Sequence, residues 1–490
     1  MRTNNFHKLF LPLVLSGVLL ASCKIKQEAL KTDITIPDNY EHASSYVKVD
    51  TFKTEQAVQP ESWRTFFTDS KLVTLIDSAL QRNYDMQAAY QTLMQSKAGL
   101  AYTKGILLPD LNLNIGAGVR KYGDYTVDGV GNYDTQYSTN LNEKQRLDRN
   151  IQDYTLGLGT SWEIDIWGKL RNQKKAALYK FLASTEGRNL VMTNVISEVA
   201  EAYYSLMILD RELEIIRENM VLQEKAVNSV STQKEFGKET ELAVELVSAQ
   251  LLQARGMVIE LEQQMIVQEN RINVLLGRYP QRIERSSLKN NTDISKAASV
   301  SIPAELLENR PDIRSAAQNL RAQNADVKAA KAAFYPTLTL SANVGYNAFR
   351  ASLLFESPAS LFYNVIGGLT TPLLNRRQLK ADLMRSKASQ AEAYIRYEKA
   401  ILIGFTEVFE TLKTAQKYED LSSIKTEQVE TLKKSIETSQ ALFMSGRATY
   451  LEIITAQENY LKAQKELLDV YSRKTRNNIQ LYKATGGGWK

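Results

Sequence analysis

The sequence predicts a mainly α-helical chain in which long coiled-coil helices alternate with four β-strands of a membrane barrel. Three observations predict this fold class. Two long spans, 110–279 and 373–490, lack proline and carry apolar residues at alternating intervals of four and three. Four shorter segments instead alternate apolar and polar residues. Both patterns occur twice, so the chain is an internal duplication.

The first residues are typical of a secretory signal. Arg2 and Lys8 precede or flank an apolar run at 9–20, which is shorter than the about 20 residues of a transmembrane helix. Cys23 follows Leu-Ala-Ser, which resembles a bacterial lipobox and predicts cleavage before an acylated (palmitate-type) cysteine. Lys24, where an aspartate would favour inner-membrane retention, leaves the outer membrane as the expected destination. A plain signal peptide with an incidental cysteine is the alternative.

The proline-free spans predict helices far longer than those of a globular domain. Gly168 to about Phe236 would be one helix of roughly 100 Å at 1.5 Å per residue. Shorter helices near 74–105 and 239–278, roughly 48 and 60 Å long, would lie end to end beside it. Its seam consists of Val195, Val199, Ala202, Leu206, Leu209, Leu213, Ile216 and Met220.

Four alternating segments predict strands, near 109–120, 152–166, 336–347 and 361–372. Each has about the length of a tilted strand that crosses an outer membrane, although the fourth alternates poorly. A soluble sheet with one wet face would also alternate, but the signal region and the strand lengths favour a membrane barrel. Four strands cannot close a barrel, and lipid cannot satisfy an open sheet edge. Other copies of the chain must therefore complete it.

The duplication divides the chain into segments. Tyr84–Leu113 aligns without gaps to Pro311–Leu340 at an offset of 227, and Gly237 aligns with Gly446 at an offset of 209. The difference of 18 residues places a longer loop near Arg120–Asn150, rich in Tyr, Asn, Asp and Gly and expected to be extracellular. The expected segments are a signal peptide 1–22, a lipidated extension 23–62, a first repeat 63–280, a linker 281–303 and a second repeat 304–490.

Glycines mark the points where the two coils should reverse, within Phe236–Thr240 and Ser445–Thr449. A bare helical-hairpin turn accounts for both glycines whatever else happens there.

The polar and aromatic residues of the second strand have milder interpretations. Glu163 and Asp165 alternate with apolar residues and are expected to face a lumen. Trp162 and Trp167 fit either an interfacial aromatic girdle or packing at the strand-to-helix junction.

The composition excludes several classes of site. The 490 residues contain 61 Lys and Arg against 55 Asp and Glu, one cysteine and two histidines. These counts argue against an internal disulfide, a cysteine-based zinc site, a Ser-His-Asp triad and a two-histidine metal site. The small positive charge is spread without a Lys/Arg block, so nucleic-acid binding is not indicated. We expect no catalytic residues, no metal and no cofactor.

Several motifs together resemble the outer membrane efflux channel family (TolC/OprM-like), in its lipoprotein branch. They are Trp63…Phe66…Asp69, the Ser-Trp-Glu-Ile-Asp-Ile-Trp-Gly run at 161–168, Asn-Arg-Pro-Asp-Ile at 309–313, Phe-Tyr-Pro at 334–336 and Gly-Gly-Gly-Trp at 486–489. The resemblance implies a homotrimer with a twelve-strand β-barrel in the outer membrane and a long periplasmic α-barrel. It also implies a duct without enzymatic activity, opened by a periplasmic adaptor (membrane fusion) protein and an inner-membrane pump of the RND type.

The resemblance also implies roles for individual residues. Glu452 matches a position where family members narrow the pore with a ring of acids, although Thr455 stands where a second acid is common. A solvated surface glutamate is the alternative for Glu452. The expected adaptor-docking tips are Gly237, Lys238, Glu239, Thr240, Gly446, Arg447, Ala448 and Thr449.

Other functions remain compatible with parts of the sequence. Within the family, export of drugs or other small molecules is expected from the lipobox branch, and type I protein secretion is the alternative. A structural coiled-coil lipoprotein of the periplasm is an alternative from a different functional class. It would not explain four alternating segments placed symmetrically in two repeats. A glycosidase with paired carboxylates would need a compact domain, which the long helices argue against.

Overall fold

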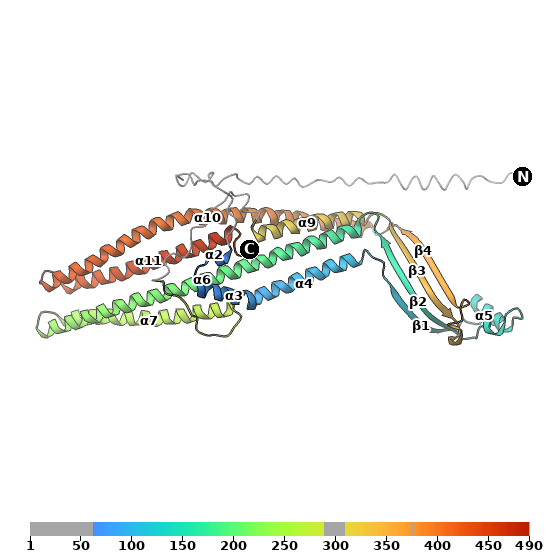
Figure 1. Ribbon diagram of the computed structural model, residues 1–490, viewed down its shortest axis with the longest axis horizontal. Coiled ribbons are helices and arrows are strands. Elements are labelled where there is room, and N and C mark those ends of the chain that lie inside the picture. Colours follow the sequence, from blue (N-terminus) through green and yellow to red (C-terminus); the bar gives the residue numbers. More distant parts are fainter. Residues whose placement is uncertain (1–61, 289–308, 375, 490) are drawn as a thin grey trace. The chain divides into compact units, whose positions relative to one another are not determined.

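The computed structural model describes residues 62–288, 309–374 and 376–489, shown in Figure 1. The expected signal peptide, Cys23, nearly all of the lipidated extension and most of the linker lie outside these residues. The helices of the first repeat are α2 (Trp63–Phe66), α3 (Ser70–Arg82), α4 (Tyr84–Gly105), α5 (Val127–Tyr137), η2 (Glu143–Gln145), α6 (Lys169–Glu235) and α7 (Glu241–Leu275). Those of the second are α9 (Pro311–Ala332), η4 (Ala351–Leu353), α10 (Arg376–Met444) and α11 (Tyr450–Ala484). The strands are β1 (Asn112–Arg120), β2 (Ile151–Ile164), β3 (Thr337–Ala348) and β4 (Leu361–Thr370).

Each repeat is built around one long helix with two shorter helices beside it. α6, of 67 residues, packs against α4 and α7, and α10, of 69 residues, packs against α9 and α11. α6 also contacts α9 and α11, so the two repeats share one helical interface (Figure 1). The predicted arrangement of long and short helices is therefore confirmed.

The short helices of each repeat meet through an equivalent contact. In the first repeat, Asn83 Nδ2 donates to the Leu275 carbonyl oxygen at 3.0 Å, where α7 ends beside the start of α4. In the second repeat, Arg310 Nη1 donates to the Ala484 carbonyl oxygen at 3.2 Å. The offsets of 227 and 209 convert the first pair into the second, so the duplication extends to single hydrogen bonds.

The apolar core lies where α2, α3 and the end of α11 pack on the middle of α6. The rings of Phe66 and Tyr482 stack with centroids 4.1 Å apart, which joins the first described helix to the last. Ile76, Ile196 and Leu206 are fully buried in the same cluster. This core fixes both ends of the described chain to α6.

Two features differ from the sequence-based expectations. A single helix over 74–105 is wrong, because α3 ends at Arg82 and α4 begins at Tyr84. Asn83 breaks the helix by accepting from the N–H groups of Asp85 and Met86, at 2.8 and 3.0 Å, while it also bonds Leu275. The long loop near Arg120–Asn150 contains the helix α5, which the coiled-coil pattern does not reveal.

The four strands form one antiparallel sheet in the order β1-β2-β3-β4. Its registers include Asn112 opposite Gly159 in the first hairpin and Thr339 opposite Gly368 in the second. The repeat offsets interconvert these two pairs as well. β2 and β3 join the hairpins, and β1 and β4 remain as the outer strands.

Candidate functional site

One face of the sheet is apolar and exposed. It carries Leu113, Ile115, Val119, Leu156, Leu158, Trp162, Leu340, Val344, Leu361, Tyr363, Val365 and Leu369. Ile115 is 75% exposed and Val365 is 68% exposed. A soluble one-sided sheet would bury this face against the rest of the protein. An apolar face turned outward is the arrangement of a strand whose outside contacts lipid.

The opposite face is mainly polar, although Ile151, Phe362 and Ile366 also lie on it. It carries Asn112, Asn114, Asp153, Thr155, Gly157, Gly159, Asn343, Gly345, Asn347 and Asn364. Asn347 Nδ2 donates to Asp153 Oδ1 at 2.7 Å and to the Thr155 hydroxyl at 2.8 Å, across the β2–β3 pair. A wall of this composition suits the water-filled inside of a channel.

The strand-to-helix junction holds the tryptophans of the second strand. Trp162 Nε1 donates to the Leu107 carbonyl at 3.0 Å, and Trp167 Nε1 donates to the Pro336 carbonyl at 2.8 Å. The Trp167 ring also stacks on Tyr335, with centroids 4.9 Å apart. Of the two interpretations open for these residues, the contacts favour packing at the junction.

The two acids of this run have local partners. Asp165 lies beyond β2 and accepts from the N–H groups of Leu170 and Arg171, at 3.2 and 2.8 Å, at the start of α6. Its expected place in a lumen is therefore wrong, because it caps a helix. Glu163 remains on the strand and pairs with Lys169 Nζ at 2.6 Å.

The two hairpin tips have the same backbone. Gly237 and Gly446 have φ angles of +68° and +69°, a conformation that favours glycine. Lys238 N donates to the Gln233 carbonyl and Gly237 N to the Lys234 carbonyl, which closes the end of α6 in a Schellman motif. Arg447 and Gly446 repeat this pattern at the end of α10. The expected turn chemistry is confirmed, and Glu239 and Ala448 fall within these turns.

The tips differ in how the returning helix begins. The Thr240 hydroxyl accepts from Ala243 N at 3.2 Å, and Ala243 is fully buried. At the equivalent place in the second tip, Glu452 is exposed, and its carboxylate accepts from Thr449 N at 2.9 Å. The Thr449 hydroxyl also bonds this carboxylate, and this bond is the main cause of a Glu452 pKa below the ordinary glutamate value. Thr455 is exposed one turn further along α11.

An open groove of about 590 Å³ runs beside the second tip. Arg447, Ala448 and Glu452 line one side of it, and Lys434, Ser435 and Thr438 of α10 line the other. The structure thus brings the predicted gate residue and part of the predicted docking tip to one surface.

Contacts between the two hairpins were not apparent from the sequence. Gln250 of α7 bonds Glu458 of α11, and Lys465 of α11 pairs with Glu212 of α6 at 3.1 Å. Nearby, the buried side-chain oxygens of Asn219, Gln223 and Gln457 have no hydrogen-bond partner among the described residues. Polar residues at positions of the heptad pattern that are otherwise apolar are the sequence feature from which this interface could have been predicted. A seam with unsatisfied amides is held less firmly than an apolar one.

α7 is more apolar than its packing requires. By length and composition it could span a membrane, yet little of its most apolar stretch is buried. Leu252, Ile259 and Ile266 are exposed at intervals of seven residues. Core helices of soluble proteins can be equally apolar, so composition alone does not place α7 in a membrane. The spacing of seven residues is instead typical of a coiled-coil contact.

Comparisons with known proteins agree with this geometry. The model of the outer membrane efflux protein family matches residues 75–278 and 302–487. The cation efflux system protein CusC of Escherichia coli K12 is 26% identical over 430 residues, 88% of this chain and 89% of CusC. A probable outer membrane lipoprotein of Salmonella typhimurium, SilC, is 27% identical over 88% of this chain and 89% of its own length.

The pyoverdine export outer membrane protein OpmQ of Pseudomonas aeruginosa is 27% identical, over 98% of this chain and 97% of OpmQ. A crystal structure of CusC superposes with a TM-score of 0.81 at 24% identity and covers 95% of this chain and all of that one. The predicted fold class is therefore confirmed, as is the predicted role of an efflux channel in the outer membrane. The chain belongs to the outer membrane efflux protein family.

Proposed function

We propose that three copies of this chain close one twelve-stranded barrel and form the exit duct of a tripartite efflux system for small molecules. The observation that carries the proposal is a four-stranded sheet with one exposed apolar face and two outer strands that lack partners within the described chain. In lipid, each unpaired backbone group costs several kcal/mol, so these edges need strands from neighbouring copies. The apolar residues exposed at intervals of seven along α7 supply, in addition, a surface through which the helices of neighbouring copies could pack.

The internal duplication gives the register of the proposed seam. Adding 209 to a β2 residue gives its β4 equivalent, and subtracting 227 from a β3 residue gives its β1 equivalent. The observed β2–β3 pair Leu156 and Tyr346 then becomes Val365 of one copy opposite Val119 of the next. Both valines lie on the apolar face of the sheet, so this register keeps lipid-facing residues together.

A disulfide test follows from this register. Val119→Cys combined with Val365→Cys should give disulfide-linked dimers and trimers on oxidation. Within one copy, β1 and β4 are three strand spacings, roughly 14 Å, apart, which is too far for a disulfide. Val119→Cys with Leu361→Cys is the matched control, displaced by about 13 Å along β4. Equal yields from both pairs, or a stable monomer in mild detergent, would overturn the trimeric barrel.

The hairpin tips are the proposed contact with a periplasmic adaptor, and Glu452 the proposed pore constriction. The docking residues are Gly237, Lys238, Glu239, Thr240, Gly446, Arg447, Ala448 and Thr449, with Thr455 beside Glu452. Three ionised Glu452 side chains around one axis would repel each other and favour cations. The interface between the two hairpins is partly polar and contains unsatisfied amides. Because its bonds are few and weak, contacts with the adaptor could replace them and let the hairpins move apart.

Reversal potentials test this constriction. Glu452→Gln should lower the cation selectivity of the reconstituted channel without loss of trimers. Glu241→Gln, an exposed acid at the first tip that pairs with Lys234, is the control and should leave selectivity unchanged. An unchanged reversal potential in Glu452→Gln would leave helix capping as the role of this residue.

Cys23 is the proposed lipid anchor, and SilC, a relative named as a lipoprotein, supports it. Cys23→Ser should abolish incorporation of labelled palmitate while the barrel still assembles, because the strands anchor independently. Label in the variant would refute the anchor.

The cargo is proposed to be a small molecule, and the pump an RND-type transporter. CusC is named for cations and OpmQ for pyoverdine, so the relatives differ in cargo. Inactivation of the chain in its host should sensitise the cells to organic antimicrobials. Sensitisation to metal salts alone would replace this cargo with metal cations, and loss of a secreted protein would indicate type I secretion.

A further inference from the structure

The segment Lys121–Asn150 between β1 and β2, here called the insert, is an ordered unit. Thr126 caps α5 by accepting from Gly129 N at 3.0 Å. Arg149 Nη2 pairs with Asp124 Oδ2 at 2.7 Å, and Asn132 Nδ2 donates to the Asp148 carbonyl at 3.3 Å. These bonds tie the end of the insert back to its beginning and to α5.

The insert is also fixed to the connection between β3 and β4. Lys144 Nζ pairs with Glu356 Oε1 at 2.7 Å. Arg350 donates through Nη2 to the Arg146 carbonyl at 3.0 Å and through Nη1 to the Glu143 carbonyl at 3.3 Å. A segment of the first repeat is thus bound to the second repeat at the end of the sheet that also carries the β3–β4 connection.

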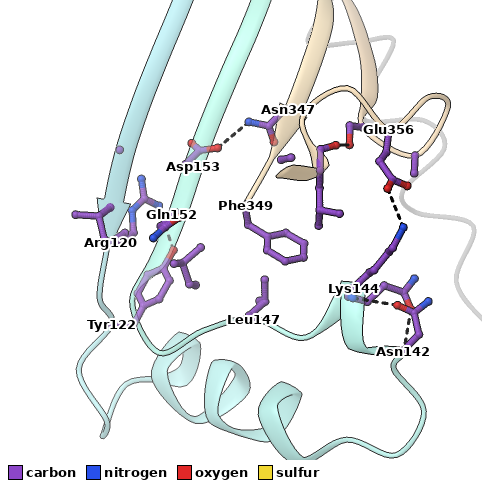
Figure 2. A pocket seen from close by; sticks show the side chains of 18 residues that line it. Arg120, Tyr122, Asn142, Lys144, Leu147, Gln152, Asp153, Asn347, Phe349 and Glu356 are labelled. Carbon is purple, nitrogen blue, oxygen red and sulfur yellow. Dashed lines mark hydrogen bonds and ion pairs between the residues drawn. The ribbon is translucent and has the colours of Figure 1, made fainter. Parts of the chain in front are cut away.

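The insert lies beyond the outer ends of the strands (Figure 2). A cavity of about 690 Å³ lies between the insert, the ends of the strands and the connection between β3 and β4. Arg120, Asp153 and Asn347 of the polar face line one part of the cavity, and Lys144 and Leu147 of the insert line another. Because side chains of the polar face share this cavity with the insert, the insert continues the proposed duct wall beyond the outer ends of the strands.

α5 presents an apolar face that the described part of the chain leaves uncovered. It consists of Val127, Val130, Tyr133 and Tyr137, which are between 52% and 91% exposed. The positions recur every three or four residues and so share one side of the helix. Gly129 and Asn132, toward the other side, are buried within the insert. This face is therefore turned away from the body that holds α5.

We infer that the apolar faces of three α5 helices pack against each other and cap the outer mouth of the duct. The inference rests on the proposed trimer. The insert leaves from the end of β1, the outer strand that pairs with β4 of the next copy in the proposed seam. The α5 face is therefore continuous with that interface, and the inserts of the neighbouring copies are the surfaces that threefold symmetry brings to it. The duct then has a constriction at its outer end in series with the one at its tips.

A single-cysteine variant tests the contact in the full-length trimer. Val130→Cys should form disulfide-linked dimers on oxidation. Any such link can be assigned to position 130, because Cys23 is the only other cysteine of the chain and is acylated in the proposed anchor. Asp128→Cys is the control, because two residues place it about 160° around α5 from Val130, and it should stay monomeric in denaturing gels. Both side chains are exposed, so both variants should fold.

The barrel pair Val119→Cys and Val365→Cys separates the two proposals. Linked barrel strands with unlinked Val130→Cys would overturn the cap and leave the trimer intact. Failure of the barrel pair itself would overturn both.

A second measurement tests the effect of the cap on the duct. In planar bilayers, a polyethylene glycol added on the outer side should reduce conductance more strongly in Tyr133→Asp than in the unaltered channel, because repelling caps admit the polymer. Addition on the tip side should give equal reductions. Equal reductions from the outer side would show that α5 does not close the mouth.

Discussion

The two repeats share a backbone but differ wherever their surroundings differ. Gly237 and Gly446 turn the coils in the same way, and Asn83 and Arg310 reach equivalent carbonyls. In contrast, the buried Ala243 follows the capping Thr240 at the first tip, whereas its repeat equivalent at the second tip is Glu452, which is exposed and bonds back to Thr449. Duplication preserved the hydrogen-bonded frame, and the side chains diverged according to what each copy of the frame contacts.

The largest expected effect lies at the seam between the repeats. A β-carbon on Gly345 would lie 2.4 Å from the Gly157 α-carbon, and this backbone cannot move aside. Gly345→Val should therefore cost about 3 kcal/mol and abolish heat-resistant trimers on gels. Gly367→Val is the control, because a β-carbon there would meet no described atom within 4 Å and would lie on the apolar, lipid-facing side of β4. Normal trimers in Gly345→Val would show that the two hairpins are not held in this register.

The junctions of the short helices should rank next. Arg310 is buried, pairs with Asp312 and Glu407 at 2.7 Å each, and bonds Ala484. Arg310→Ala should destabilise the chain by about 2–3 kcal/mol, because it removes charged hydrogen bonds. Asn83→Ala, which removes a cap and one buried bond, should cost about 1–2 kcal/mol. Denaturant titrations followed by circular dichroism measure both losses of stability. A larger loss for Asn83→Ala than for Arg310→Ala would contradict the view that the two junctions are equivalent in place but differ in the strength of their side-chain bonds.

Alanine at the tip glycines should have equal effects in both repeats. Each glycine has a positive φ and open space around its α-carbon, so the cost is backbone strain of about 1–2 kcal/mol. Gly237→Ala and Gly446→Ala should each loosen one hairpin tip, measured by amide hydrogen exchange of the tip residues. Proline at position 446 cannot adopt this φ and should impair efflux further, with the barrel intact. A much larger effect at one tip would show that the turns are not equivalent.

The smallest expected effect is a pH response that is larger at the second tip than at the first. The lowered pKa of Glu452 means that its contribution to α11 is fully present above about pH 4.5 and is lost as pH falls through the lowered value. The Thr240 hydroxyl that caps α7 does not titrate in this range. Amide exchange, corrected for intrinsic rates, should therefore accelerate at Leu451 on acidification more than at Leu242. Glu452→Gln should remove the difference, and an equal acceleration at both residues would contradict it.

Much of the fold follows from local patterns. Apolar residues at every second position predict the strands, and apolar residues at alternating steps of four and three predict the long helices. Each spacing places the apolar side chains on one face of the corresponding element. The turns at Gly237 and Gly446 are local as well, since only the residues just before them supply their bonds. The end-to-end placement of short helices was predictable because their lengths match one long helix.

Other features depend on residues far apart in the chain. The cap at Asn83 is local, but its side chain also donates to the carbonyl of Leu275, 192 residues away, and no local pattern predicts that contact. α5 has only three turns and no seam with a long helix, and the ion pair of Lys144 with Glu356 holds the insert that carries it to the connection between β3 and β4. The cap that Asp165 provides is local by comparison, because its partners Leu170 and Arg171 are five and six residues further along the chain.

The sequence by itself therefore determined the duplication, the element types, the reversal points and the family resemblance, because periodicity and glycine conformation are local properties. Only the tertiary structure decided which face of the sheet is uncovered, how β2 pairs with β3, and how the insert is held to the connection between β3 and β4. Those outcomes arise from contacts between segments separated by tens to hundreds of residues, and a linear pattern does not record such contacts.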